Sequence, residues 1–267
     1  MSNRSGNHFE KHVNVMMFAS KHRFFEISVD LKNMPGTLGA VADALTKNGF
    51  NILSCDLFND YHVEVGTCCI IAEAISNKVT LDGTKSLLAS IPAVKNLVVT
   101  ESANGLIVDS RFPLKFTSGD RAMILRSDVM RSMVESIISK FGSGGEVIVF
   151  ELGRAAGQKD GEDLVASMGR EEAIDNLNHL SRIYSALGWG QSTLKSKESD
   201  RSSVTVQIRN SFEVTTNEKS TEPTCIFIRG HIFGFFASIL GTSYQVKETS
   251  CQSQGDESCE FVAKRSA

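Results

Sequence analysis

The sequence predicts an α+β protein with two domains. An N-terminal βαββαβ domain precedes a mixed α/β domain in which helices pack on an antiparallel sheet. Three observations predict this class. The chain has 267 residues, which is enough for two ordinary domains. Strand and helix patterns alternate with short connections over residues 22–102 and change in spacing beyond a polar segment at 103–120. The last part of the chain, within 121–265, closes with one strongly apolar helix and a hairpin.

The first domain is expected to span residues 22–102. Its first segment, FFEISVDL, is rich in strand formers, and the next places its apolar residues on one helical face and closes at Gly49. The order of elements matches the split βαβ arrangement of ferredoxin-like folds. The expected strands and helices lie at 24–31, 38–49, 51–58, 65–74, 81–91 and 94–100.

The second domain is expected to span residues 121–265, after a linker at 103–120. It opens with an amphipathic helix that GSGG terminates, and it ends with an apolar helix and a hairpin. Between them we expect a strand at EVIVFELG, a further helix and an alternating strand, joined by a polar, charged stretch after Gly190. The expected ranges are a helix at 121–141, a strand at 146–153, a helix at 169–187, a strand at 203–214 and a helix at 227–241.

Composition narrows the classes of protein. A hydrophobic content of 41% with 22% charged residues is typical of a soluble globular chain. The net charge of −3 makes direct nucleic-acid binding unexpected, because such domains are basic. The longest apolar stretch, 226–240, contains Arg229 and His231 and is too short to span a membrane. Residues 1–20 show no targeting segment, and six cysteines are too few for a disulfide scaffold, so we expect a cytoplasmic protein.

The connection between the first strand and the first helix is a candidate ligand site. Proline and glycine force a tight turn there and let the helix begin at once. Exposed backbone amides at a helix start attract the carboxylate of a small ligand. The turn is equally well explained as a plain strand-to-helix connection. Its residues are Asn33, Met34, Pro35, Gly36 and Leu38.

The stretch FFEISVDLKNMPGTLGAVADALTKNGFNI resembles the opening of an ACT domain. ACT domains regulate by binding amino acids or similar small molecules, and they commonly pair side by side. The resemblance implies a homodimer with an amino-acid site lined by the five residues of this turn. ACT domains that serve only in dimerisation are also known, so a purely structural role for residues 22–102 stays open.

Six cysteines fall into two groups. Cys55, Cys68 and Cys69 lie in the first domain, where adjacent strand positions point to opposite faces and supply no convergent ligands. We therefore expect these three to be small apolar packing residues.

The second group is Cys225, Cys251 and Cys259. A hairpin would bring Cys251 and Cys259 together, with Cys225 arriving from the start of the apolar helix. Three thiolates suit zinc. A hairpin disulfide or three unligated core thiols would explain the same residues. A closed zinc site needs a fourth ligand, for which the nearby candidates are Glu213, Asn210, Glu257 and His231.

The run CIFIRGHIFGFFASILGTSYQVKETSCQSQGDESCEFV resembles the end of V4R domains, and VIVFELGRAAG, the Gly188-Trp189-Gly190 element and NSFEV agree with it. In phenol-sensing activators that carry this domain, three cysteines bind structural zinc beside an aromatic-ligand pocket. The resemblance implies that role for Cys225, Cys251 and Cys259, whereas the acidic fourth ligand of those sensors has no counterpart that the sequence identifies. The expected aromatic pocket residues are Trp189, Phe212 and Phe233, with Phe227, Phe235 and Phe236 nearby.

Catalytic motifs are missing from the sequence. It contains no G-x-S-x-G or H-E-x-x-H, and the glycine cluster at 142–145 lacks the lysine of a phosphate-binding loop. We therefore expect a non-catalytic regulator that binds an amino acid in the first domain, a hydrophobic or aromatic molecule in the second, and a downstream protein partner. Two alternatives remain: an enzyme or accessory factor in tetrapyrrole vinyl reduction, and an interaction protein that resembles vesicle-tethering subunits.

Overall fold

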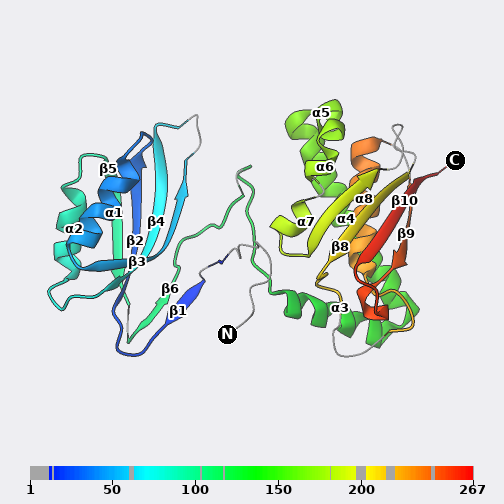
Figure 1. The fold of residues 1–267 in the computed structure, drawn as a ribbon, viewed down its shortest axis with the longest axis horizontal. Coiled ribbons are helices and arrows are strands. Elements are labelled where there is room, and N and C mark those ends of the chain that lie inside the picture. The colour runs from blue at the N-terminus through cyan, green and yellow to red at the C-terminus, as the bar shows by residue number, and fades with distance from the viewer. Residues whose placement is uncertain are drawn as a thin grey trace. The chain divides into compact units, whose positions relative to one another are not determined.

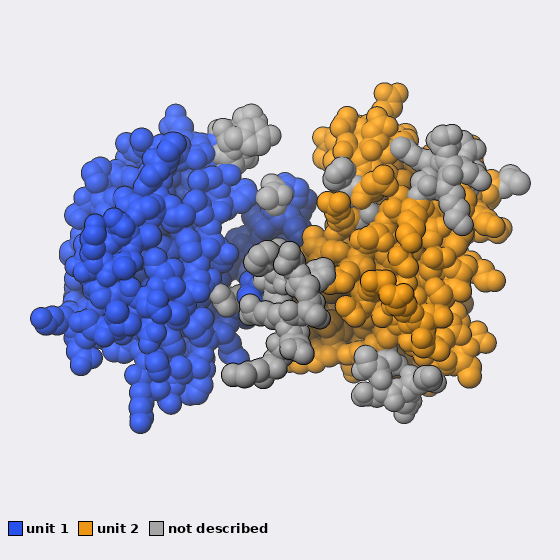
Figure 2. All heavy atoms as spheres, in the orientation of Figure 1, with its two compact units in different colours: residues 1–122 blue, residues 123–267 orange. Residues whose placement is uncertain are grey.

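The computed structural model divides the chain into two compact units, residues 1–122 and 123–267 (Figures 1 and 2). Each unit has its own hydrophobic core. The boundary falls just beyond the expected linker at 103–120. Among the described residues, no helix combines the length and apolar character needed to cross a lipid bilayer. The structure describes residues 12–13, 15–59, 63–102, 104–116, 118–180, 182–196, 203–214, 220–241 and 244–266, so most of the segment searched for a targeting signal lies outside them.

Unit 1 contains a four-stranded antiparallel sheet with strand order β3-β4-β2-β5. Its elements follow the predicted order of strands and helices. Alternate residues of the central strand β2, among them Phe25, Ile27 and Val29, are buried in the core that α1 and α2 cover (Figure 1). The elements are β2 (Phe24–Lys32), α1 (Thr37–Lys47), β3 (Phe50–Phe58), β4 (Val65–Ala74), α2 (Leu81–Ala89) and β5 (Val94–Glu101).

A short ribbon forms on the other face of this sheet. Strand β1 (Met16–Phe18) pairs antiparallel with β6 (Leu106–Val108), and Ile107 packs against Phe24 and Ile71. Strand β6 therefore lies inside the segment expected as a linker, and it belongs to unit 1.

Unit 2 contains a second four-stranded antiparallel sheet, with strand order β7-β8-β10-β9. Helix α8 lies against β9 and β10, and α4 packs along α8. The resulting core is continuous from the sheet through α8 to α4. The elements are α3 (Ser127–Phe141), α4 (Ser143–Met168), β7 (Gln191–Ser196), β8 (Ser203–Arg209), α8 (Ile226–Leu240), β9 (Tyr244–Ser250) and β10 (Cys259–Arg265).

The strand expected at 146–153 is wrong, because these residues belong to the 26-residue helix α4. Val147, Ile148 and Val149 favour a strand locally, but the packing of α4 on α8 decides the conformation. Buried glycines let the two helix backbones touch. A Cβ atom at Gly157 would lie 2.0 Å from the carbonyl oxygen of His231. In a helix, glycines four residues apart lie on one face, and here they form the surface on which α8 packs.

Three further expectations about unit 2 are corrected. The helix at 169–187 is divided into α5 (Arg170–Asp175), α6 (Leu177–Leu180) and α7 (Ile183–Ala186). Asn176 ends α5, since its side-chain amide donates to the carbonyl oxygen of Glu172 at 3.0 Å. The polar stretch after Gly190 begins as strand β7, and its remainder, 197–202, lies outside the described residues. The first helix starts at Ser127 rather than at 121.

Candidate metal centre and aromatic cluster

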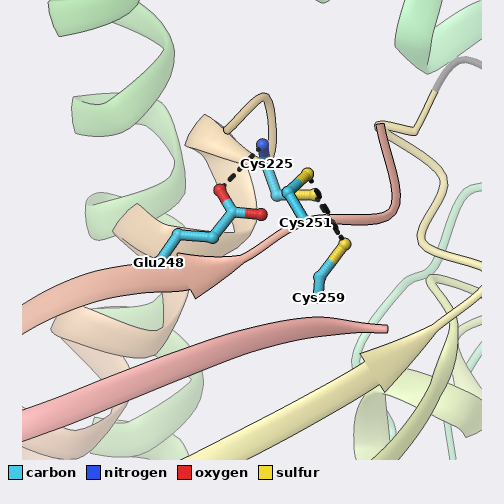
Figure 3. A group of neighbouring side chains, drawn as sticks. All are labelled: Cys225, Glu248, Cys251 and Cys259. Atoms are coloured by element: carbon cyan, nitrogen blue, oxygen red, sulfur yellow. Dashed lines mark hydrogen bonds between the residues drawn. The ribbon is translucent and has the colours of Figure 1, made fainter. Parts of the chain in front are cut away.

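Three cysteines meet at the start of α8. Cys225 precedes the first residue of α8, Cys251 directly follows β9, and Cys259 opens β10. Figure 3 shows the three cysteines lying next to one another. All three are fully buried. The sulfur of Cys259 lies 3.5 Å from that of Cys225 and 3.8 Å from that of Cys251. The cysteines are free thiols in this structure, which does not contain the alternative hairpin disulfide.

Glu248 supplies the fourth group of this cluster. One oxygen atom from Glu248 and the three sulfurs all lie within 4.8 Å of one another. The Glu248 Oε2 atom accepts a hydrogen bond of 3.2 Å from the backbone N–H of Cys225. Its Oε1 atom is buried and, within the described part of the chain, has no hydrogen-bond partner. A buried carboxylate oxygen without a partner is costly, and a metal ion at this point would satisfy it.

The protonation of the cluster also fits a cation. The thiols of Cys225 and Cys259 hold the pKa of Cys251 far below its usual range, because they favour a thiolate there. The pKa of Cys225 is raised correspondingly by its hydrogen bond with Cys251. Burial raises the pKa of Glu248 to about 8. The buried thiols and the carboxyl group therefore shift one another's acidity, and groups of this kind exchange their protons for a metal ion on binding.

The donor set is three sulfurs and one carboxylate oxygen, which is a combination that zinc accepts in tetrahedral geometry. The cluster therefore fits a tetrahedral cation held between the start of α8 and the β9–β10 hairpin. The fourth group was missed in the sequence because Glu248 lies three residues before Cys251 in an alternating strand. The sequence feature that could have indicated Glu248 as a ligand is its position in the strand that leads into the hairpin with Cys251 and Cys259.

Glu213, a sequence candidate for the fourth ligand, has a different role. Its two carboxylate oxygens accept hydrogen bonds of 2.8 Å from the backbone N–H groups of Phe227 and Ile228. It therefore caps the N-terminus of α8, where the helix otherwise leaves these donors unpaired. Burial raises the pKa of Glu213 to about 8, and the two N–H donors oppose that shift.

Asn210 and Glu257 also lie outside the cluster. The backbone N–H of Asn210 donates to the side chain of Gln252 at 2.7 Å. Glu257 is exposed and pairs with Arg209 at 2.6 Å. Neither residue belongs to the group of potential ligands.

His231, the last of these candidates, is fully buried inside unit 2. Its Nε2 atom lies 3.0 Å from a carboxylate oxygen of Asp160, and its Nδ1 atom lies 3.0 Å from the hydroxyl of Tyr184. A neutral ring that donates to Asp160 accepts at Nδ1 from the tyrosine. Burial, followed by Asp160, raises the pKa of Tyr184, so its hydroxyl keeps the proton that it donates. These two hydrogen bonds connect the half-buried Asp160 with the buried core.

Aromatic rings surround this polar pair. The ring of Trp189 lies 5.0 Å from His231 and 5.5 Å from Phe227, measured between centroids. Phe212 completes the group at 6.0 Å from Trp189. The structure thus brings two of the expected pocket residues, Trp189 and Phe212, together. Phe233 is not among them, because it packs against Phe150 of α4 at 5.9 Å.

The turn between β2 and α1 holds the remaining expected site residues. Asn33 donates from its side chain to the carbonyl oxygen of Val63 at 3.0 Å, and Met34 and Pro35 are exposed. Gly36 takes the left-handed conformation at the N-cap of α1, with open space around its Cα atom. Leu38 instead packs against the core of unit 1. The turn leaves the start of α1 exposed, and the contact of Leu38 with the core holds this start in place.

Comparison with known families identifies one segment of the chain. Residues 204–265 match the family model of the V4R domain. This segment begins in β8 and contains α8, Glu248 and all three clustered cysteines. The resemblance to V4R domains is therefore confirmed for these residues. The comparison with curated proteins finds no match.

Several solved structures are similar to this chain. The phenol-responsive sensory domain of the transcription activator PoxR, determined with phenol, is 15% identical at a TM-score of 0.47, covering 58% of this chain and 84% of its own. A vinyl-4-reductase family protein from Methanocaldococcus jannaschii is 20% identical at 0.41, covering 55% and 85%. A trafficking protein particle complex subunit 3 from Naegleria fowleri, covalently bound to palmitic acid, is 11% identical at 0.41, covering 53% and 95%.

Proposed function

We propose that this chain is a non-catalytic, ligand-responsive regulatory protein whose unit 2 binds a small hydrophobic or aromatic molecule. One observation carries the proposal. Within the segment that matches the V4R domain, helix α8 begins at a cluster suited to a metal ion and continues through a buried polar pair surrounded by aromatic rings.

The proposed ligand site lies around the side chains of Trp189, Phe212 and Phe227. Small-molecule sites are mostly apolar, with a few polar groups that fix the orientation of the ligand. The hydrogen-bonded pair of Tyr184 and His231 supplies such polar groups among the rings. A ligand with one hydroxyl or carbonyl group on an aromatic body matches this combination.

We further propose a structural zinc ion held by Cys225, Glu248, Cys251 and Cys259. When bound, the ion would neutralise the thiolates and cross-link the cluster. The four residues come from the start of α8, from β9 and from β10, so they tie the helix to the hairpin. Phe227 follows Cys225 by two positions, and the cluster therefore fixes the end of α8 that carries the aromatic group.

For unit 1 we propose an ACT-type, ferredoxin-like regulatory domain that binds an amino acid and pairs two chains in a homodimer. The βαββαβ order and the exposed start of α1 at Gly36 support this proposal. Backbone N–H groups at that start would face the carboxylate of the ligand.

The ligand proposal is tested by thermal-shift and calorimetric titration of the full chain with phenol and a series of simple aromatic compounds. We expect at least one compound to raise the melting temperature, and we expect Trp189→Ala to remove that shift. Phe233→Ala is the matched control, because Phe233 packs against Phe150 outside the cluster. No response from the wild-type protein, or an equal response from both variants, would contradict the proposed site.

A further inference from the structure

Two cysteines of unit 1 lie close together at one edge of its sheet. The sulfur atoms of Cys55, in the edge strand β3, and Cys68, in β4, are 3.6 Å apart. The sequence interpretation treated both as apolar packing residues. The structure keeps that role for Cys68, which is fully buried, but Cys55 is exposed.

A β-bulge aims these side chains at each other. The register of β3 against β4 shifts between Ile52 and Ser54, which leaves one extra residue in β3 and reverses its alternation beyond that point. Cys55 then pairs with Ile70, and Leu57 pairs with Cys68. Directly paired residues share a face of the sheet, so Cys55 and Cys68 are diagonal neighbours on the same face.

Cys69 is adjacent to Cys68 in the sequence and is an alternative partner for Cys55, but its side chain lies on the opposite face of the sheet. It pairs with Asp56 in β3 and with Ser28 in β2, and it is almost fully buried. Its alternation with Cys68 along β4 keeps the two side chains on different faces. Cys69 therefore offers a matched control for a reaction of Cys55 with Cys68.

We propose that Cys55 and Cys68 form a thiol-oxidation site, in which a peroxide oxidises Cys55 and Cys68 then closes an intrachain disulfide. The difference in exposure sets the order of events. Solvent reaches Cys55, whereas Cys68 is closed to it. Once Cys55 is oxidised, the sulfur of Cys68 stands next to it.

In the first step the sulfur of Cys55 attacks hydrogen peroxide. An S–O bond forms, the O–O bond breaks, and one water leaves as Cys55 becomes a sulfenic acid. In the second step the sulfur of Cys68 attacks that of Cys55. An S–S bond forms, the S–O bond breaks, and the oxygen leaves as a second water with the proton of Cys68. The two thiols lose two electrons, and the peroxide is reduced to two waters.

The geometry and the acidity of Cys68 set the relative rates. Disulfide formation requires the sulfur atoms to close from 3.6 Å to about 2 Å. Because β3 is an edge strand, its backbone can shift toward β4 together with the side chains. Burial raises the pKa of Cys68 to about 12. Cys68 therefore stays a thiol while Cys55 reacts, and we expect the second step to be the slower one.

The test treats the full chain with hydrogen peroxide, blocks free thiols under denaturing conditions and maps the peptides by mass spectrometry. Trypsin leaves Cys55, Cys68 and Cys69 in one peptide, residues 48–78, because that segment contains no internal lysine or arginine. Additional cleavage after Glu64 separates Cys55 from the other two. We expect a linked peptide pair that dithiothreitol releases, with fragment ions that assign the bond to Cys68 rather than Cys69. The thiols of unit 2 fall in other peptides and do not interfere.

Variants make the result specific. We expect Cys55→Ser, at an exposed position, and Cys68→Ala to abolish the linked pair, and we expect Cys69→Ser to retain it. The Cys55→Ser result stands on its own if substitution of the buried Cys68 prevents folding. The proposal is overturned if Cys55 links to Cys69, links to a second chain, or proceeds to sulfinic acid with no intrachain bond.

Discussion

Two buried glutamates of unit 2 differ at the level of single atoms. Both oxygens of Glu213 accept backbone N–H groups of α8, so this carboxyl group is fully occupied as a helix cap. Only Oε2 of Glu248 is occupied in that way, and Oε1 is buried beside three sulfurs without a partner among the described residues. Burial does not distinguish the two residues, whereas membership of the cysteine cluster and the accounting of hydrogen bonds do.

This difference leads to a prediction about metal content. We expect the wild-type chain to contain one zinc ion and Cys251→Ser to contain none. Glu248→Gln is expected to weaken zinc affinity by at least about 10-fold, since even the outer partners of metal ligands contribute that much. Competition with a chromophoric chelator measures the affinity. Glu257→Gln is the matched control, because Glu257 is exposed and pairs with Arg209. Equal affinity in both variants would remove Glu248 from the site.

Glu213 leads to a prediction about pH. Burial raises its pKa from 4.5 to about 8, so the folded state binds the proton more tightly than the unfolded state. Its contribution to stability is fully present below about pH 4.5 and is lost as the pH rises through about 8. We expect the free energy of unfolding to fall between pH 5 and 8. The decline should be smaller in Glu213→Gln, whose side chain stays uncharged.

Denaturant unfolding across this pH range, at constant metal loading, provides the measurement. The exposed Glu171→Gln variant serves as the control and should follow the wild-type profile. If Glu213→Gln follows it as well, titration of Glu213 does not couple to folding.

At the level of secondary structure, the contact between α4 and α8 depends on glycine. A Cβ atom at Gly157 would lie 2.0 Å from a backbone oxygen of α8, which no side-chain movement relieves. We expect Gly157→Ala to lower the free energy of unfolding by about 3 kcal/mol through this overpacking. Gly144→Ala, in the same helix with open space around it, should change stability by less than about 1 kcal/mol, in the stabilising direction. Chemical denaturation of both variants compares them, and a similar change of stability in both would show that the close contact at Gly157 does not set the effect.

The same contact explains what the sequence could and could not predict. Elements whose own pattern agrees with their packing, such as β2, α1 and α8, were predicted within a few residues. Helix α4 was not, because Val147, Ile148 and Val149 form a strand-like run whose conformation is decided by glycines that matter only against α8.

Site residues also divide into those that a local pattern predicts and those that depend on packing between distant elements. The three cysteines could be proposed from their spacing around a hairpin, which is a local property. Glu248 and the pairing of Tyr184 with His231 could not, because they depend on which strand and which helix become neighbours. The surroundings of Phe233 also depend on packing. It shares helix α8 with His231, and its ring packs against Phe150 of α4.

At the level of the whole molecule, the two hydrophobic cores have no residue in common. The core of unit 1 is built from its sheet, α1 and α2, and the core of unit 2 from its sheet, α4 and α8. The proposed metal ligands all belong to unit 2. Two separate cores should unfold in two transitions, and a metal bound by one of them should stabilise that one alone.

Calorimetry of the zinc-loaded chain, with and without a chelator, tests this expectation. Removing a metal present at 100 times its dissociation constant costs about 2.7 kcal/mol of stability. For a domain of this size that loss lowers a melting temperature by roughly 10 °C. We expect the chelator to shift one transition by this amount and to leave the other in place. A fragment of residues 123–267 should reproduce the shifted transition, and Cys251→Ser should show no response to the chelator. One cooperative transition for the whole chain, or an equal shift of both, would mean that the units are energetically coupled despite their separate cores.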